Sequence, residues 1–376
     1  MGDAVRFWMI FGAVLTVMHL VIWAQARRHL HLGPWVSILA LAASLALALF
    51  SVSIQSLPET WPPSVTIPIW WMVYFWLALA IFLFLSHLAV LVLEGVLALF
   101  GSPAAALLRT KTCFFAVLAF SCLVVTYGTQ EAAQVRVLTK EIVSAKVKKP
   151  LRIVAVSDIH LGALNLNGRL KILANRINDL EPDVVAFVGD IVNDHTQWLG
   201  TEAAVLAGIK APLKVGVFGN HERYVGDAVS ASIFDRSGII LLRDAALTRP
   251  EWNLRVLGVD DPGRSTQVTE DFAQSIRTAA QGLTPDEFSL LLIHRPLDWK
   301  EVAVPLGIDL TLSGHTHGGQ MFPFTLIVNA IYEFPRGFYD MDGKHLAVSS
   351  GAGYWGPPIR VLAPPDIILV DVKPAK

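Results

Sequence analysis

Residues 152–160, Arg-Ile-Val-Ala-Val-Ser-Asp-Ile-His, combine a short apolar stretch with two polar residues close behind it. The stretch Arg152–Ser157 is rich in β-branched and small apolar residues, which is typical of a strand buried on both faces of a sheet. Asp158 and His160 come at the carboxyl end of this predicted strand. Because ligands of open α/β sheets bind outside the carboxyl ends of strands, both side chains are candidate site residues.

The same arrangement recurs further along the chain. The predicted strands Val184–Val188 and Lys214–Phe218 end in Gly189-Asp190 and Gly219-Asn220-His221-Glu222. Helical stretches follow the strands, and the clearest of them is Gly168–Leu180. Further helices are expected at 202–207 and 228–236, and further strands at 239–242, 254–258, 289–293, 346–349 and 367–372. This alternation of strands and helices predicts an α/β fold.

Two more polar groups follow later in the chain. His294 comes directly after the predicted strand at 289–293, and residues 314–320 are Gly-His-Thr-His-Gly-Gly-Gln. Together these positions offer seven candidate metal ligands with nitrogen and oxygen donors: Asp158, His160, Asp190, Asn220, His294, His315 and His317. Seven donors are too many for one tetrahedral zinc ion and suit two divalent ions bridged by a carboxylate. His221, beside Asn220, would be free to donate a proton to a leaving group or to contact phosphate.

The five motifs Asp-x-His, Gly-Asp, Gly-Asn-His-Glu, a lone His and Gly-His-x-His resemble, in type and order, those of the calcineurin-like metallophosphoesterases. The Gly-His-Thr-His-Gly-Gly-Gln ending resembles the bacterial membrane-anchored branch of that superfamily. The resemblance covers roughly residues 150–372 and implies a β-sandwich flanked by helices. One departure is Asn193, since many relatives carry Asp three residues after the bridging Asp. This departure concerns substrate contacts or loop geometry and leaves the metal ligands intact.

The resemblance also implies a role for each residue. Asp158, His160 and His317 would hold the first metal, and Asp190 would bridge it to the second. Asn220, His294 and His315 would complete the second site, and His221 would be the catalytic histidine. The implied reaction is hydrolysis of a phosphoester or pyrophosphate bond by a metal-bridging hydroxide. Imidazole and carboxylate ligands suit two divalent ions of manganese, iron or zinc, without selecting among them.

The first third of the chain differs in composition from the rest. Only eight of the chain's 61 charged residues lie within residues 1–130. The charged fraction of this part is therefore far below the roughly 25% of a soluble protein. Four apolar stretches are long enough to cross a bilayer as helices, at 7–24, 35–54, 69–100 and 112–127. Prolines between 58 and 68 predict a loop before the third stretch. We therefore expect a multi-pass transmembrane anchor at 1–130 and a metallophosphoesterase domain at 131–376, joined by about 25 residues before the first strand.

The distribution of basic residues bears on which side of the membrane the domain occupies. The connections between the first and second apolar stretches and between the third and fourth carry four basic residues, Arg27, Arg28, Arg109 and Lys111. The opposite side of the membrane would carry Arg6, Arg136 and Lys140. The positive-inside rule therefore favours an extracytoplasmic domain by a small margin. A cleaved signal peptide is the alternative for the first stretch, because Ala24-Gln25-Ala26 resembles a cleavage site. The stretch is longer than the usual 7–15 apolar residues, which favours a retained anchor.

We expect a cell-membrane phosphohydrolase whose phosphorylated substrate lies near the bilayer, such as a phospholipid or a nucleotide-lipid. A net charge of -1 gives no basis for nucleic-acid binding. The alternative from another class is a membrane scaffold or transport component whose phosphoesterase-like domain only binds. The sequence indicates neither protein partners nor the oligomeric state.

Several polar or aromatic residues outside the motifs have a structural interpretation. His195 is interpreted as a solvated loop histidine, and Asp260-Asp261 as part of a turn before Pro262. The pair Tyr354 and Trp355 could line an acyl pocket or pack against the sheet. Two intramembrane histidines, His19 and His87, are interpreted as structural.

Overall fold

The computed structural model describes residues 2–54, 61–162, 164, 167–193, 199–263 and 268–375. Contacts divide the chain into two compact units, Met1–Gln130 with Gly356–Ile359, and Glu131–Trp355 with Arg360–Lys376. Helices make up the first unit, whereas the second combines two sheets with surrounding helices.

Four helices of the first unit are long and apolar enough to cross a membrane, which confirms the predicted number. They are α1 (Gly2–Leu30), α2 (Pro34–Ser53), α3 (Pro63–Leu99) and α4 (Lys111–Ala132), with the short η2 (Pro103–Arg109) before α4. The loop predicted through Pro68 is wrong, because α3 begins at Pro63 and contains Pro68. Proline already has a helical φ, and near a helix start its missing N–H costs a single hydrogen bond. Pro58 lies outside the described residues.

Three charged residues of the helical unit pair with one another. Glu94, whose side chain is only 8% exposed, accepts hydrogen bonds from Arg28 at 2.6 Å and from Arg109 at 2.7 Å. Arg28 lies in the last turn of α1 and Arg109 in η2, so one end of α1 and the α3–α4 connection meet at this carboxylate. Charged side chains in membrane segments are tolerated when they pair in this way.

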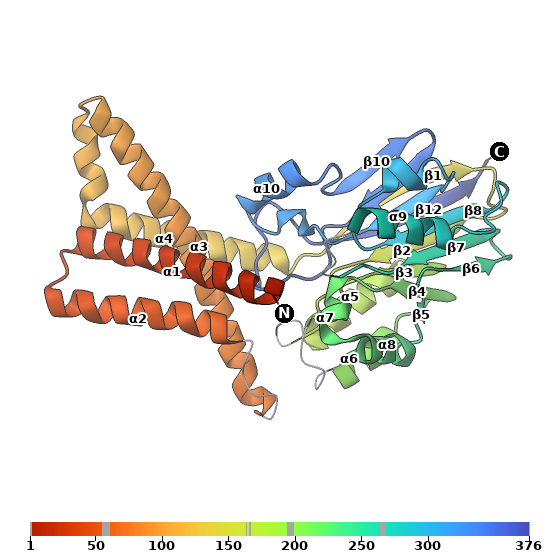
Figure 1. Ribbon diagram of the computed structural model, residues 1–376, viewed down its shortest axis with the longest axis horizontal. Helices are drawn as coiled ribbons and strands as arrows, with labels where there is room; N and C mark the ends of the chain where they lie inside the picture. The colour runs from red at the N-terminus through yellow and green to blue at the C-terminus, as the bar shows by residue number, and fades with distance from the viewer. Residues whose placement is uncertain are drawn as a thin grey trace. The chain divides into compact units, whose positions relative to one another are not determined.

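Two six-stranded mixed sheets form the second unit (Figure 1). The first has the order β1 (Arg136–Ser144), β12 (Asp366–Pro374), β2 (Leu151–Val156), β3 (Val184–Val188), β4 (Leu213–Val217) and β5 (Ile240–Leu241). The second has the order β10 (Gly337–Met341), β11 (Lys344–Val348), β9 (Leu310–Ser313), β8 (Phe288–Ile293), β7 (Leu254–Val259) and β6 (Ala245–Arg249). Strands β2 to β5 run parallel, as do β7, β8 and β9, so within each set the carboxyl ends share one edge.

Apolar residues pack in three layers, one between the two sheets and one on the outer face of each sheet. Ile153, Val215 and Leu290 belong to the core shared by the two sheets. The outer layers hold side chains of the surrounding helices: α5 (Asn167–Asp179), α6 (Leu199–Ala207) and α8 (Asp227–Arg236) with the first sheet, and α9 (Val268–Ala279) and η4 (Trp299–Ala303) with the second (Figure 1). The predicted α/β fold, a β-sandwich flanked by helices, is thereby confirmed.

The first strand of this unit is β1, which the sequence did not predict. Most of its residues are exposed or half-buried, because β1 is an edge strand that pairs only with β12 among the described strands. Helix α4 ends at Ala132 and β1 begins at Arg136, so three residues connect them. The expected connection of about 25 residues was therefore too long.

Asp309, directly before β9, is a buried carboxylate among basic and hydroxyl neighbours. Its carboxylate accepts hydrogen bonds from Lys146, Lys344 and both the backbone and hydroxyl of Ser289. Burial opposes ionisation, but the lysines outweigh it and lower the pKa of Asp309. Its stabilising contribution is therefore complete above the ordinary carboxyl pKa of about 3.9 and is lost as the pH falls through the lowered folded value.

We expect Asp309→Asn to lower the free energy of unfolding by about 2 kcal/mol at pH 7, because two cations lose their shared anion. The matching fall in the thermal midpoint is about 4–8 °C. Intrinsic fluorescence during heating measures it, with the exposed Asp286→Asn as control. The deficit should shrink below about pH 4. An equal deficit at all pH values would contradict the ion-pair account.

Candidate metal centre

The predicted site residues lie just beyond the ends of neighbouring strands in the two sheets. Asp158 and His160 follow β2, Asp190 follows β3, and Asn220 opens the short helix α7 (Asn220–Val225) after β4. From the second sheet come His294 after β8 and His315 after β9, while His317 begins the 3-10 turn η5 (His317–Gly319). Five of these residues have a left-handed backbone: Asp158, His160, Asp190, His315 and His317. Non-glycine residues adopt this conformation at a cost, and such strain gathers at functional sites.

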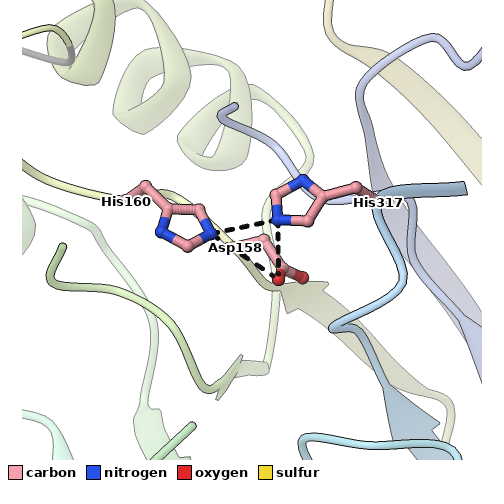
Figure 2. Close-up of side chains that lie close together, drawn as sticks. All are labelled: Asp158, His160 and His317. Atoms are coloured by element: carbon pink, nitrogen blue, oxygen red, sulfur yellow. Dashed lines mark hydrogen bonds and ion pairs between the residues drawn. The ribbon is translucent and has the colours of Figure 1, made fainter. Parts of the chain in front are cut away.

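One group of possible ligand atoms consists of Asp158, His160 and His317 (Figure 2). The Nε2 atoms of the two histidines lie 3.0 Å apart. Asp158 Oδ1 lies 3.4 Å from His317 Nε2 and 3.9 Å from His160 Nε2. Three donor atoms from two distant chain segments thus converge on one point, as a bound cation requires.

A second group consists of Asp190, His294 and His315. Asp190 Oδ2 lies 3.2 Å from His294 Nε2, which in turn lies 3.2 Å from His315 Nδ1. Asp190 Oδ2 also lies 3.8 Å from His160 Nε2, and His160, Asp190 and His221 form a further group. Asp190 therefore stands between the first group and the second.

Hydrogen bonds outside these groups orient the imidazoles. His294 Nδ1 donates to the carbonyl oxygen of Val188 at 2.8 Å, and His160 Nδ1 lies 3.1 Å from Asn193 Oδ1. Both contacts place the proton on Nδ1 and leave the Nε2 lone pair facing the site. Asn193, the one departure from the resembled motif, thus supports a candidate ligand with its amide oxygen.

Two residues to which the sequence assigned no role hold the site together. Glu222 is fully buried and accepts hydrogen bonds from the backbone N–H groups of Asp190, Val192 and Gly219. Arg360 is also fully buried and donates to the carbonyl oxygens of His317, Gly351, Gly353 and Ala363. Its Nη2 also lies 3.2 Å from His317 Nδ1. Glu222 belongs to the quoted Gly-Asn-His-Glu motif, whereas no motif contains Arg360.

The electrostatics of the site favour bound positive charge. Burial raises the pKa of Asp158 to about 6, and the neighbouring Asp190 adds to this rise. Burial lowers the pKa of both His160 and His315 to about 3, which keeps these imidazoles neutral and able to bind a metal. Burial also disfavours the charged form of His294, but Asp190 and Asp158 outweigh it and raise the pKa of His294 to about 10. A cation bound at Nε2 would take the place of that proton.

Unsatisfied polar atoms test whether metal ions fit these residues. Asp158 Oδ1 and Asn220 Oδ1 are buried and accept no hydrogen bond from the described residues. A buried acceptor without a partner is costly, and a bound cation would satisfy each of these oxygens. The donor set therefore fits two divalent ions with mixed nitrogen and oxygen ligands.

A family model for calcineurin-like phosphoesterases matches residues 151–319. An uncharacterized metallophosphoesterase of Aquifex aeolicus is 33% identical over 253 residues, covering 66% of this chain and 95% of the relative. The chain belongs to the metallophosphoesterase family. A Danio rerio metallophosphoesterase described as a transmembrane protein is 31% identical over 272 residues, covering 69% of this chain and 62% of that protein. The match thus spans less than two thirds of that relative.

Among solved structures, a 5'-nucleotidase precursor from Thermus thermophilus is similar, with 14% identity and a TM-score of 0.36. The match covers 59% of this chain and 55% of that one. For this metallophosphoesterase, the family supports phosphohydrolase activity and implies divalent metal ions. The four apolar helices and the transmembrane relative support a membrane protein.

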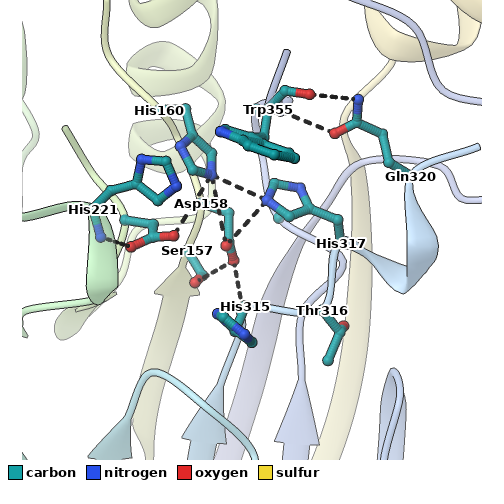
Figure 3. A network of polar contacts seen from close by, with 12 residues as sticks. Ser157, Asp158, His160, His221, His315, Thr316, His317, Gln320 and Trp355 are labelled. Atoms are coloured by element: carbon teal, nitrogen blue, oxygen red, sulfur yellow. Dashed lines mark hydrogen bonds and ion pairs between the residues drawn. The ribbon is translucent and has the colours of Figure 1, made fainter. Parts of the chain in front are cut away.

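In this metallophosphoesterase, His221 lies beside the groups of candidate metal ligands, and its ring is near those of His160 and Trp355. Its ring centroid is 4.7 Å from that of His160, in a T-shaped arrangement, and 6.2 Å from Trp355. The backbone N–H of His221 donates to Asp190 Oδ1 at 2.8 Å. Gln320 exchanges two hydrogen bonds with the backbone of Trp355, which fixes that indole near the site (Figure 3).

The remaining residues singled out in the sequence have mainly structural contacts. Asp260 pairs with Arg223 and Arg243, and Asp261 pairs with Arg295 and accepts from the Gly263 N–H. Tyr354 is buried and donates to the Leu164 carbonyl, whereas Trp355 is half exposed.

In the helical unit, Trp76 donates to His19. The buried ring nitrogens of His87 have no hydrogen-bond partner in the described chain. His195 lies outside the described residues.

Proposed function

We propose that this protein is a dinuclear metal-dependent phosphohydrolase that acts near the membrane surface, with residues 131–376 as its catalytic domain. The observation that carries the proposal is the position of Asp190, which belongs to the group with His294 and His315 and lies 3.8 Å from His160 of the other group. One carboxylate beside two donor sets suits a pair of ions.

In this proposal each side chain has a defined role. Asp158, His160 and His317 hold one ion, and Asn220, His294 and His315 hold the other. Asp190 binds both. When bound, such a pair of ions supplies an activated water at neutral pH and neutralises charge on the phosphoryl oxygens. The protein's own contribution is a fixed geometry, because Glu222, Arg360 and Asn193 orient the loops and rings that carry the ligands.

We assign His221 the transfer of a proton to the departing oxygen. Its backbone is fixed by Asp190, and its ring packs against His160 and Tyr224 at the site. Within the described chain, Nδ1 of His221 is buried without a hydrogen-bond partner. A positioned imidazole suits general acid catalysis at neutral pH.

The substrate we propose is a phosphoester or pyrophosphate borne by a lipid, such as a phospholipid or a nucleotide-lipid. Support comes from the membrane helices and from the three residues between α4 and β1, which keep the domain near the bilayer. The Gly-His-Thr-His-Gly-Gly-Gln motif supports placement in the bacterial membrane-anchored branch. The basic residues at the helix connections favour an extracytoplasmic domain.

Metal removal tests the enzymatic proposal. The purified full-length protein should contain about two divalent ions per chain and hydrolyse a soluble aryl phosphodiester. Chelation should abolish the hydrolysis, and manganese, iron or zinc should restore it. Elemental analysis and product absorbance measure the two effects. A protein that binds no metal and hydrolyses neither aryl phosphoesters nor lipid phosphoesters would support the scaffold or transport alternative instead.

A further inference from the structure

Helix α10 (Phe324–Ile331) exposes apolar side chains beside the metal centre. Its sequence, Phe-Thr-Leu-Ile-Val-Asn-Ala-Ile, is six-eighths apolar, yet none of the eight residues is buried. Leu326 is 58% exposed, Ile327 52% and Ile331 70%. An amphipathic helix of a soluble domain normally turns such residues to the core. This helix turns them outward.

The contacts of the first helical turn explain this orientation. A Cβ at Gly319 would lie 2.5 Å from the Cα of Thr325, so the backbone of this turn packs directly on η5. Thr325 is half-buried at this contact, whereas Leu326, Ile327 and Ile331 are exposed. Beyond the helix, the Tyr332 ring lies 6.1 Å from that of His315. The helix is thus held next to the candidate ligands near both of its ends.

Neighbouring residues extend the apolar surface. The N–H of Phe322 donates to the Val361 carbonyl, which brings Phe322 beside Leu362, and both side chains are exposed. We define the apolar patch as Phe322, Phe324, Leu326, Ile327, Ile331 and Leu362. Residues 318–332 contain no charged side chain. An uncharged, exposed group of large apolar residues is typical of a surface that binds a partner or a membrane.

The chain itself indicates which apolar medium this patch meets. Three residues between the end of α4 and the start of β1 span at most about 14 Å. Since α4 can cross a membrane, the domain cannot move far from the bilayer surface. Short amphipathic segments there bury their apolar face about 5–10 Å into the headgroup–acyl boundary.

We propose that the apolar patch inserts into the lipid bilayer and presents the metal centre to lipid-borne phosphoesters. The docking itself is independent of catalysis, whereas the substrate class rests on the proposed function. Insertion shields the patch from water. It also places the segment that follows β9, with His315 and His317, next to the headgroups. A lipid substrate then reaches the site without leaving the bilayer.

Site-specific fluorescence tests the docking. In a full-length background with Cys113 and Cys122 replaced by serine, Ile327→Cys is labelled with an environment-sensitive nitrobenzoxadiazole dye and reconstituted into phosphatidylcholine–phosphatidylglycerol vesicles. The dye should emit at shorter wavelength and be quenched by doxyl-labelled lipids. Ser232→Cys, exposed on α8, serves as control. Quenching at 327 no stronger than at 232 overturns the docking. A blue shift without lipid quenching also overturns it and indicates a protein partner or a second copy.

Hydrolysis tests the substrate class separately. We expect Leu326→Asp combined with Ile327→Asp to lower the rate on a vesicle-embedded phospholipid relative to a soluble aryl phosphodiester by at least about tenfold. Ile172→Asp, at an exposed isoleucine of α5, should leave this ratio unchanged. An unchanged ratio in the double variant overturns the lipid-presentation role. If the unmodified protein hydrolyses nothing, the proposed function fails, while the quenching still decides the docking.

Discussion

Asp190→Asn is expected to lower phosphoester hydrolysis about a thousandfold, which corresponds to about 4 kcal/mol in the activation barrier. Asp190 is buried, belongs to the group with His294 and His315, and lies 3.8 Å from His160 of the other group, so its charge would serve two ions. Asparagine keeps the shape and an oxygen that can accept the His221 N–H bond, but it removes the negative charge. The metal content should fall from about two ions per chain to one or fewer.

Turnover of an aryl phosphodiester and elemental analysis of the same preparation measure both effects. Asp235→Asn, at an exposed aspartate of α8, is the matched control and should change neither quantity. Circular dichroism should show an unchanged fold in both variants. Full activity of Asp190→Asn with two bound ions would show that Asp190 is not the bridging ligand.

The strands that the sequence predicted are those with a distinctive local pattern of residues. Strands β2, β3 and β4 are short apolar stretches buried on both faces, and the polar residues that end them are easily recognised. The edge strands β1, β6 and β10 have mostly exposed or half-buried residues. Their pairing depends on neighbours far along the chain, so no local pattern indicated them.

The candidate site shows the same division. All seven predicted ligands lie at or shortly after strand ends, and six of them fall into the groups that the structure brings together. The seventh, Asn220, is buried beside Asp190's partner His221. Arg360 was missed because it acts on His317 across 43 residues of sequence and from outside any strand. Helix α10 was not predicted, and a helical pattern alone would not have shown that its apolar side faces outward.

Gly219→Ala is expected to disrupt the centre without removing any ligand. A Cβ at Gly219 would lie 2.2 Å from Asp190 Oδ1 and 2.5 Å from the Asp190 nitrogen, distances that no side chain tolerates. The Asp190 carboxylate must move, and its bond with the His221 N–H must break or stretch. A displacement of about 1 Å at a catalytic centre costs about a hundredfold in rate, and overpacking costs about 1–3 kcal/mol in stability.

The matched control is Gly168→Ala in α5, where an added Cβ meets nothing within 4 Å. There the substitution should leave turnover unchanged and raise stability by up to about 1 kcal/mol, since alanine favours helix more than glycine does. Turnover, metal content and thermal midpoint are measured for both variants. If Gly219→Ala keeps the original rate and two ions, the loop after β4 must be able to retreat from Asp190. The close packing of β3 and β4 ends would then not be what fixes the shared carboxylate.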